Sequence, residues 1–93
     1  MQSLQEIVGA AQRGDLEAFS TLYDHYFDRV YRYVMSRVRE PPEAEDLTQE
    51  IFLKVFRALP SFRFHGPPFT AWLFRIARNT VVDWVRARKR IRE

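Results

Sequence analysis

Five side chains near the C-terminus share a pattern that suits nucleic acid. On a helix at about 100° per residue they fall in one arc of about 100°: Arg75, Arg78, Asn79, Val82 and Arg86, with Phe74 beside them. Arginine grips phosphates through paired N–H donors, and asparagine can read a base edge. A solvated basic face has the same pattern. Asp83 lies next to the arc, and pairing it with Arg86 would be plain surface electrostatics.

The segment before this face is unusually aromatic for a loop. Residues 60–69 read PSFRFHGPPF, with three phenylalanines, Arg63, a histidine and no acid. We expect Phe69, and one of Phe62 and Phe64, to fold onto the protein. A ring left exposed beside an arginine would suit stacking on unpaired bases. The prolines restrict the loop, so it loses less entropy on binding.

A third group of residues combines acidic and polar side chains with one leucine. A helix over 42–59 places on one stripe Asp46, Gln49, Glu50, Leu53 and Arg57. A single exposed leucine on a charged helix is common. The alternative is an acidic patch with an apolar anchor that docks a basic partner helix.

The sequence lacks the residue patterns needed for metal binding, for phosphate-binding loops and for nucleophilic catalysis. The 93 residues contain no cysteine, and the two histidines, His25 and His65, have no partners at metal-ligand spacing. There is no glycine-rich phosphate loop and no nucleophile elbow. We therefore expect no enzyme activity, no metal and no cofactor. We see no signal peptide and no apolar run of about 18 residues, so we expect no membrane insertion and an intracellular location.

Apolar residues at helical spacing indicate the elements that position these groups. The expected helices cover about 3–13, 16–38, 42–59 and 69–90, with a loop over 60–68. Asp15 is placed to cap the second helix, and Pro41-Pro42 separates the second from the third. The sequence predicts an all-α fold, a compact bundle of about four helices forming one domain over 1–93.

The net charge of +3 conceals a division along the chain. Residues 1–50 carry five arginines against ten acids, a charge of −5, whereas residues 51–93 carry ten basic residues against two acids, a charge of +8. A basic half indicates nucleic acid or an anionic membrane as partner, and the acidic half indicates a further contact.

These features, in this order, resemble region 2 of bacterial sigma factors of the extracytoplasmic-function (ECF) group. The resemblance covers essentially the whole chain and is carried by three blocks: 15-DLEAFSTLYDHYFDRVYRYVMSRV-38, 44-AEDLTQEIFLKVFRALPSFR-63 and 69-FTAWLFRIARNTVVDWVRARKR-90.

The resemblance implies a non-enzymatic transcription factor domain of the bacterial cytoplasm. Its third helix would dock on the β′ clamp helices of core RNA polymerase through Asp46, Gln49, Glu50 and Leu53. Its fourth helix and the preceding loop would bind the −10 promoter element as non-template single-stranded DNA. The loop would capture a flipped base, and an anti-sigma factor is an expected partner. The matching loop positions are Phe62, Arg63 and Phe64, and those near the −10 pocket are Lys54, Ala58, Phe74, Ile76 and Asn79.

A complete ECF factor also carries a second helical domain that reads the −35 element, and we expect this chain to lack it. Two other functions fit the residues. One is a helical protein-interaction module, binding polymerase or an anti-sigma factor without useful DNA affinity. The other is a generic binder of duplex DNA.

Overall fold

The protein is a bundle of four α-helices, described over residues 2–92 in a computed structural model. The helices are α1 (Leu4–Gln12), α2 (Leu16–Val38), α3 (Pro41–Ala58) and α4 (Phe69–Arg92), and a short 3₁₀ turn, η1 (Leu59–Ser61), follows α3. The expected all-α fold is confirmed. The 3₁₀ turn takes up residues that were expected to belong to the end of the third helix and the start of the loop.

Local signals explain where the first helices begin and end. Ser3 caps α1, because its hydroxyl accepts from the Glu6 backbone N–H at 3.1 Å. Gly14 then adopts φ 93°, a conformation that favours glycine, and turns the chain. The Asp15 carboxylate accepts from the N–H groups of Glu17 and Ala18 and starts α2.

The α2–α3 junction combines a left-handed residue with proline. Arg39 ends α2 at φ 66°, and its N–H donates to the Met35 carbonyl at 3.1 Å. Pro41 and Pro42 occupy the first turn of α3, where their missing N–H groups are not needed. The two helices therefore turn back on each other within a few residues.

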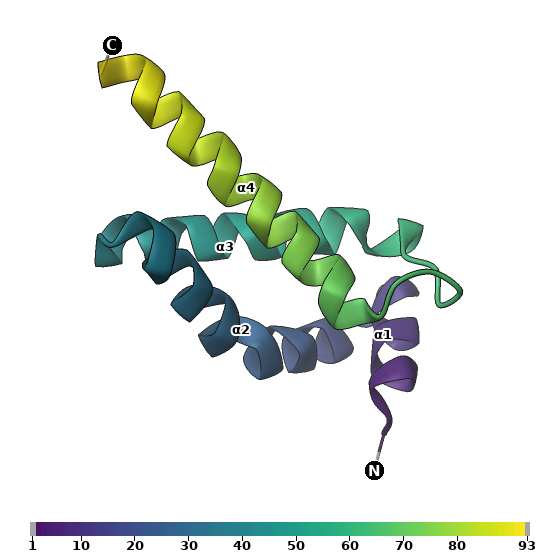
Figure 1. The fold of residues 1–93 in the computed structure, drawn as a ribbon. Coiled ribbons are helices and arrows are strands. Elements are labelled where there is room, and N and C mark those ends of the chain that lie inside the picture. The colour runs from purple at the N-terminus through teal and green to yellow at the C-terminus, as the bar shows by residue number, and fades with distance from the viewer. Residues whose placement is uncertain (1, 93) are drawn as a thin grey trace.

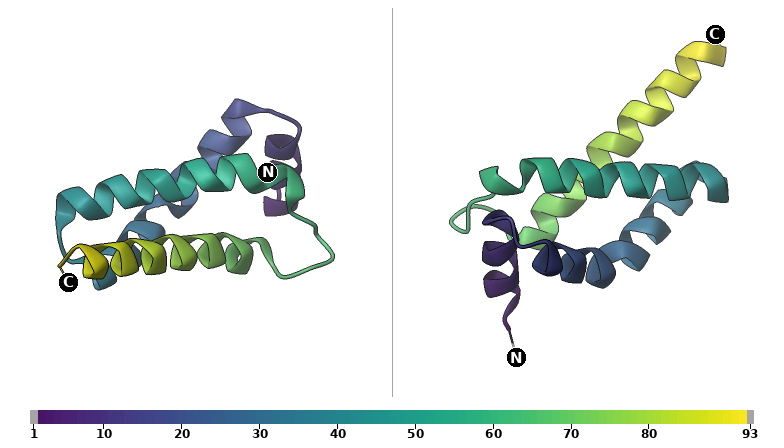
Figure 2. Two further views of the ribbon diagram at one scale, coloured as in Figure 1. Left: turned by 90° about the horizontal axis from the view of Figure 1, so that it is seen from above. Right: turned by 180° about the vertical axis from the view of Figure 1, so that it is seen from behind.

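The long helices enclose one apolar core. Figure 1 shows α4 crossing α3 and continuing beyond the other helices, and Figure 2 shows α1 standing at the end of the bundle where the loop lies. The molecule is elongated, with extents of 48 × 23 × 19 Å. The largest fully buried side chains come from all four helices and η1, and include Val8, Tyr26, Ile51, Leu59 and Leu73. Leu4, an apolar residue in the first turn of α1, is exposed.

Candidate functional site

The loop between η1 and α4 is anchored at its first residue. Phe62 is only 3% exposed, and its ring lies 5.4 Å from the Phe69 ring and 5.2 Å from the Trp72 ring. The Gln12 side-chain amide donates to the carbonyls of Leu59 and Phe62, at 3.1 and 2.9 Å. Helix α1 thus holds the start of the loop.

The burial of Phe62 corrects one expectation about the site. Its ring belongs to the core and has no free face on which a base could stack. Phe64 is the exposed aromatic of the loop, at 42%, and its ring meets the Phe62 ring edge to face at 5.0 Å. Of the two phenylalanines, Phe62 therefore folds onto the protein and Phe64 is the ring left exposed beside an arginine.

Polar groups of α1 lie beside the exposed Phe64 ring, and Arg63 is held against its own loop. One Arg63 nitrogen, Nη1, donates to the carbonyls of Pro60 and Phe62, at 2.8 and 3.1 Å, which fixes the side chain against its own loop. A hollow of about 510 Å³ lies between Phe64 and α1, with Gln5, Glu6 and Arg13 among its walls. The sequence held no signal for this contribution of α1, because nothing in its spacing places α1 beside the loop.

The outer face of α4 presents the expected polar side chains. Arg75, Arg78, Asn79 and Arg86 are exposed, and Val82 is half-buried. Phe74 and Ile76 are also half-buried. The Phe74 ring contacts Tyr33 edge to face at 6.1 Å and lies 5.7 Å from the Arg29 guanidinium carbon. Phe74 can therefore offer DNA only part of its ring.

Helix α2 adds cations to this face. Arg29 lies over the rings of Tyr26 and Phe74, at 5.5 and 5.7 Å, and Arg37 lies over Tyr33 at 5.7 Å. Sequence reasoning missed both arginines. Dividing the charge by halves of the chain assigned them to the acidic half, whereas helix packing brings them to the basic surface.

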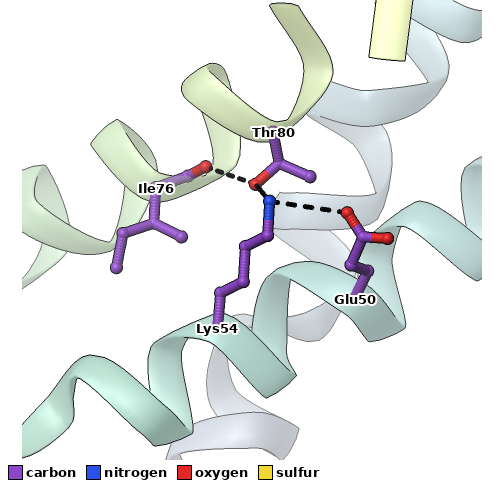
Figure 3. A network of polar contacts seen from close by, with 4 residues as sticks. All are labelled: Glu50, Lys54, Ile76 and Thr80. Atoms are coloured by element: carbon purple, nitrogen blue, oxygen red, sulfur yellow. Dashed lines mark hydrogen bonds and ion pairs between the residues drawn. The ribbon is translucent and has the colours of Figure 1, made fainter. Parts of the chain in front are cut away.

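A polar network joins α3 to α4 at the centre of the molecule (Figure 3). The Lys54 amine donates to the Thr80 hydroxyl at 3.2 Å, and that hydroxyl donates to the Ile76 carbonyl at 2.8 Å. The same amine lies 3.5 Å from a Glu50 carboxylate oxygen. Lys54 and Ala58 are both half-buried on the side of α3 that carries this contact. One lysine thus touches both the helix expected to dock a protein and the helix expected to bind DNA.

The outer surface of α3 is acidic with two apolar residues. Asp46, Gln49 and Glu50 are exposed, as are Leu53 at 48% and Phe56 at 42%. The Phe56 ring rests edge-on against Phe19 of α2 at 5.0 Å. Sequence reasoning identified Leu53 and missed Phe56, which follows it by one helical turn and could have been found by that spacing.

Residues 2–92 lack the features of a membrane span and of a metal site. No helix there is long and apolar enough to cross a membrane. The same residues contain no group of three or more His, Cys, Asp or Glu side chains placed to hold a metal ion.

Comparison with known proteins identifies the fold and the class of protein. The family described as Sigma-70 region 2 matches residues 22–91, and the chain belongs to this family. Several of its curated relatives are named ECF RNA polymerase sigma factors, and this places the chain in the ECF group. It is 49% identical over 80 residues to ECF RNA polymerase sigma factor BldN of Streptomyces coelicolor and 31% identical over 86 residues to SigW of Bacillus subtilis.

The chain corresponds to part of these relatives. The matches cover 86% of this chain and 30% of BldN, and 92% of this chain and 46% of SigW. Among solved structures, an engineered region 2 of sigmaE in complex with GTAAAA has a TM-score of 0.87 and 36% identity, over 96% of this chain and 92% of that one. BldN in its complex with RsbN has a TM-score of 0.78 and 50% identity, over 86% of this chain and 58% of that one.

Proposed function

We propose that this chain is a promoter-recognition domain that binds the −10 element as single-stranded non-template DNA and docks on core RNA polymerase. The observation that carries the proposal is the likeness, over nearly the whole of both chains, to an engineered region 2 of sigmaE in complex with GTAAAA. The domain works by binding, without catalysis, in the bacterial cytoplasm.

The DNA side of the proposal is supported by the loop and α4. Phe64 offers an exposed ring for stacking, and each stacked base contributes about 1–3 kcal/mol. Asn79 is exposed and can form paired hydrogen bonds with a base edge. Arg63 and Arg75 supply attraction to the backbone, and Lys54 can turn from Thr80 towards a phosphate. Extruding a base costs a few kcal/mol, which stacking and phosphate contacts offset.

The protein side of the proposal is supported by the acidic surface of α3. Leu53 and Phe56 are apolar groups that a partner helix can cover, and the surrounding carboxylates suit basic side chains of that helix. We propose the β′ clamp helices of polymerase as this partner. An anti-sigma factor is the second proposed partner, and BldN is a relative seen in a complex with another protein, RsbN.

The DNA proposal is tested with single strands of both senses. Fluorescence anisotropy over a salt series compares labelled GTAAAA with its complement TTTTAC, and we expect a preference for GTAAAA. Asn79→Ala should reduce that preference and leave the salt slope unchanged. Arg75→Ala should lower the slope by about 0.7, the value for one phosphate contact on a single strand. Equal binding of both strands at every salt concentration would refute sequence reading, whereas no binding of either strand would favour a module that binds only proteins.

The docking proposal is tested with a charge reversal. Asp46→Lys combined with Glu50→Lys should abolish pull-down by a β′ clamp-helix fragment, since both exposed carboxylates become cations. The matched control is Glu17→Lys combined with Asp24→Lys, which reverses two exposed acids of α2. Circular dichroism must show both proteins folded. Retained pull-down by the α3 variant would assign docking to another surface.

A further inference from the structure

Gln12, the last residue of α1, ties that helix to the loop through one side chain. Its amide nitrogen Nε2 donates to the Leu59 carbonyl at 3.1 Å and to the Phe62 carbonyl at 2.9 Å. The side chain thus uses both of its N–H donors on the backbone that leads from α3 into the loop. Across residues 2–92, no other side chain from outside residues 59–68 hydrogen-bonds the backbone of that segment.

The other hydrogen bonds at this point come from the segment itself. The Leu59 carbonyl also accepts from the Phe62 N–H at 3.1 Å, and the Phe62 carbonyl also accepts from Arg63 Nη1 at 3.1 Å. The Gly66 N–H donates to the Arg63 carbonyl at 3.1 Å and closes a turn. Bonds within a loop move with the loop, whereas the two bonds from Gln12 fix it to the rest of the protein.

The ring and the carbonyl of Phe62 are fixed by different contacts. Packing against Phe69 and Trp72 determines where the ring lies. The direction of the carbonyl depends instead on ψ, which is 137° at Phe62, in the extended region. A non-glycine residue has a second well, the helical one, at ψ of about −40°, roughly half a turn away. Because ψ sets the direction in which the chain leaves Phe62, the bond from Gln12 selects the course of the next two residues.

Those two residues carry the groups that the proposed function assigns to DNA. Arg63 places its Nη1 on the same Phe62 carbonyl that Gln12 binds. Phe64 is exposed, its ring meets only the edge or face of Phe62 among the aromatic rings, and a hollow lies between it and α1. The position of the Phe64 ring therefore depends on the backbone that leads to it.

We propose that Gln12 is a positioning residue for base reading. Its amide holds the Phe62 carbonyl in the direction that presents Arg63 and Phe64 to the single strand, so the loop is preorganised before DNA binds. Gln12 acts through the loop and is not itself a contact with DNA. This inference rests on the proposed function, because that function makes the loop the place where bases are bound. It gives α1 a part in the selection of DNA sequence.

The size of the effect follows from the loss of two neutral hydrogen bonds. Each changes an equilibrium constant by about fivefold, so both together change it by at most about 25-fold. Without them the loop samples other directions, and the apparent Kd rises as the competent fraction falls. Gln12→Met keeps the length of the side chain but removes the donors. It should raise the Kd for GTAAAA by about three- to 25-fold, whereas the Kd for the complement TTTTAC should change less than twofold.

The first measurement is the ratio of the two affinities, from anisotropy with both labelled strands and the 93-residue chain. Gln12→Glu keeps the shape of glutamine but turns a carboxylate towards two carbonyl oxygens, so it should lower the ratio at least as much as Gln12→Met. The matched control is Asp15→Ala. It also removes two hydrogen bonds between a side chain and the backbone, those from the N–H groups of Glu17 and Ala18, and neither involves residues 59–68. It should leave the ratio unchanged.

The second measurement observes the loop without DNA. Relaxation of backbone ¹⁵N nuclei, including relaxation dispersion, reports motion from picoseconds to milliseconds. The amides of Arg63 and Phe64 should become more mobile in Gln12→Met and keep their wild-type values in Asp15→Ala. A merely structural role for Gln12 would lower stability without changing either the ratio or the motion of these amides in the folded protein, and circular dichroism verifies that each variant is folded.

The outcomes separate this inference from the proposed function. If the wild-type chain prefers GTAAAA and both Gln12 variants keep the full ratio, the inference is overturned and the proposed function stands. A ratio that falls equally in Asp15→Ala would assign the effect to general destabilisation and overturn the inference as well. So would a lowered ratio with unchanged relaxation at Arg63 and Phe64, because Gln12 would then act without moving the loop. Equal binding of both strands by the wild-type chain refutes the proposed sequence reading and the inference together.

Discussion

Phe62 and Phe64 stand two residues apart in one loop, and the structure predicts opposite consequences for their removal. Phe62 is buried among Phe69 and Trp72, and a buried Phe→Ala change costs about 3–5 kcal/mol. A domain of 93 residues has about 5–14 kcal/mol of stability in total, so Phe62→Ala should remove a large part of it. Phe64→Ala loses mainly one edge-to-face contact, or about 1 kcal/mol.

For DNA affinity the order of the two effects is reversed, and the change at Phe64 is the more damaging one. If Phe64 stacks on a base, its removal costs about 1–3 kcal/mol of binding, which is roughly a five- to 150-fold rise in Kd. Phe62→Leu keeps an apolar side chain in the core and should cost less than about 1.5 kcal/mol. Its affinity for GTAAAA should stay within twofold.

Two assays measure this pair of effects: urea unfolding followed by circular dichroism, and anisotropy with labelled GTAAAA. Phe62→Leu is the folded comparison if Phe62→Ala does not fold. An unchanged Kd for Phe64→Ala would exclude a stacking role for that ring. If Phe62→Leu weakens DNA binding as strongly as Phe64→Ala does, the two rings share one role and the division between core and DNA contact is refuted.

Three further substitutions test what holds the helices in place, each by its urea midpoint. Asp15→Ala removes the cap of α2 and should cost about 1 kcal/mol, or about 4–8 °C in Tm, whereas mid-helix Asp24→Ala should cost far less. Arg88→Leu removes two half-exposed ion pairs and should cost about 1 kcal/mol or less, a loss that shrinks in high salt; an equal loss in 1 M salt would contradict an ionic cause. Thr80→Val keeps the side-chain shape but removes the hydroxyl that Lys54 binds, and it should lower the free energy of unfolding by about 1 kcal/mol. An unchanged urea midpoint would show that water replaces this contact.

The core was predictable because helical periodicity depends on local sequence. Apolar residues that recur at helical spacing in α2 and α3, such as Tyr26, Val30 and Ile51, are buried in the structure. Leu4 is an exception among the apolar residues, because it stands in the first turn of α1, where less of the bundle covers it.

Which loop phenylalanine is buried and which is exposed was not predictable from the sequence, because it depends on contacts between residues far apart in the chain. Spacing alone left Phe62 and Phe64 equivalent, and the structure distinguishes them through Gln12, which lies 50 residues before Phe62 and binds its carbonyl. The basic surface predicted from the sequence lacked two of its arginines for the same reason. Arg29 and Arg37 reach it only through the packing of α2 against α4, and a hydrophobic pattern does not encode that crossing.

Lys54 lies between the acidic surface of α3 and the basic surface of α4. Its amine contacts Glu50 on the first and Thr80 on the second. A phosphate that draws the amine away leaves Glu50 without its cation and open to one from another protein. A partner that takes Glu50 frees the amine in turn. Where both proposed surfaces are in use, thermodynamic linkage requires each ligand to raise the affinity for the other by one common factor.

The size of this reciprocal effect follows from the exposure of the pair. A half-exposed ion pair contributes about 0.2–1 kcal/mol, which sets the common factor at about 1.4 to 5. Titration of GTAAAA with and without the clamp-helix fragment measures it, and Lys54→Met should reduce it to one; a factor unchanged in that variant would exclude Lys54 as its source. If both proposed ligands bind, this one side chain would couple their binding without any change of fold.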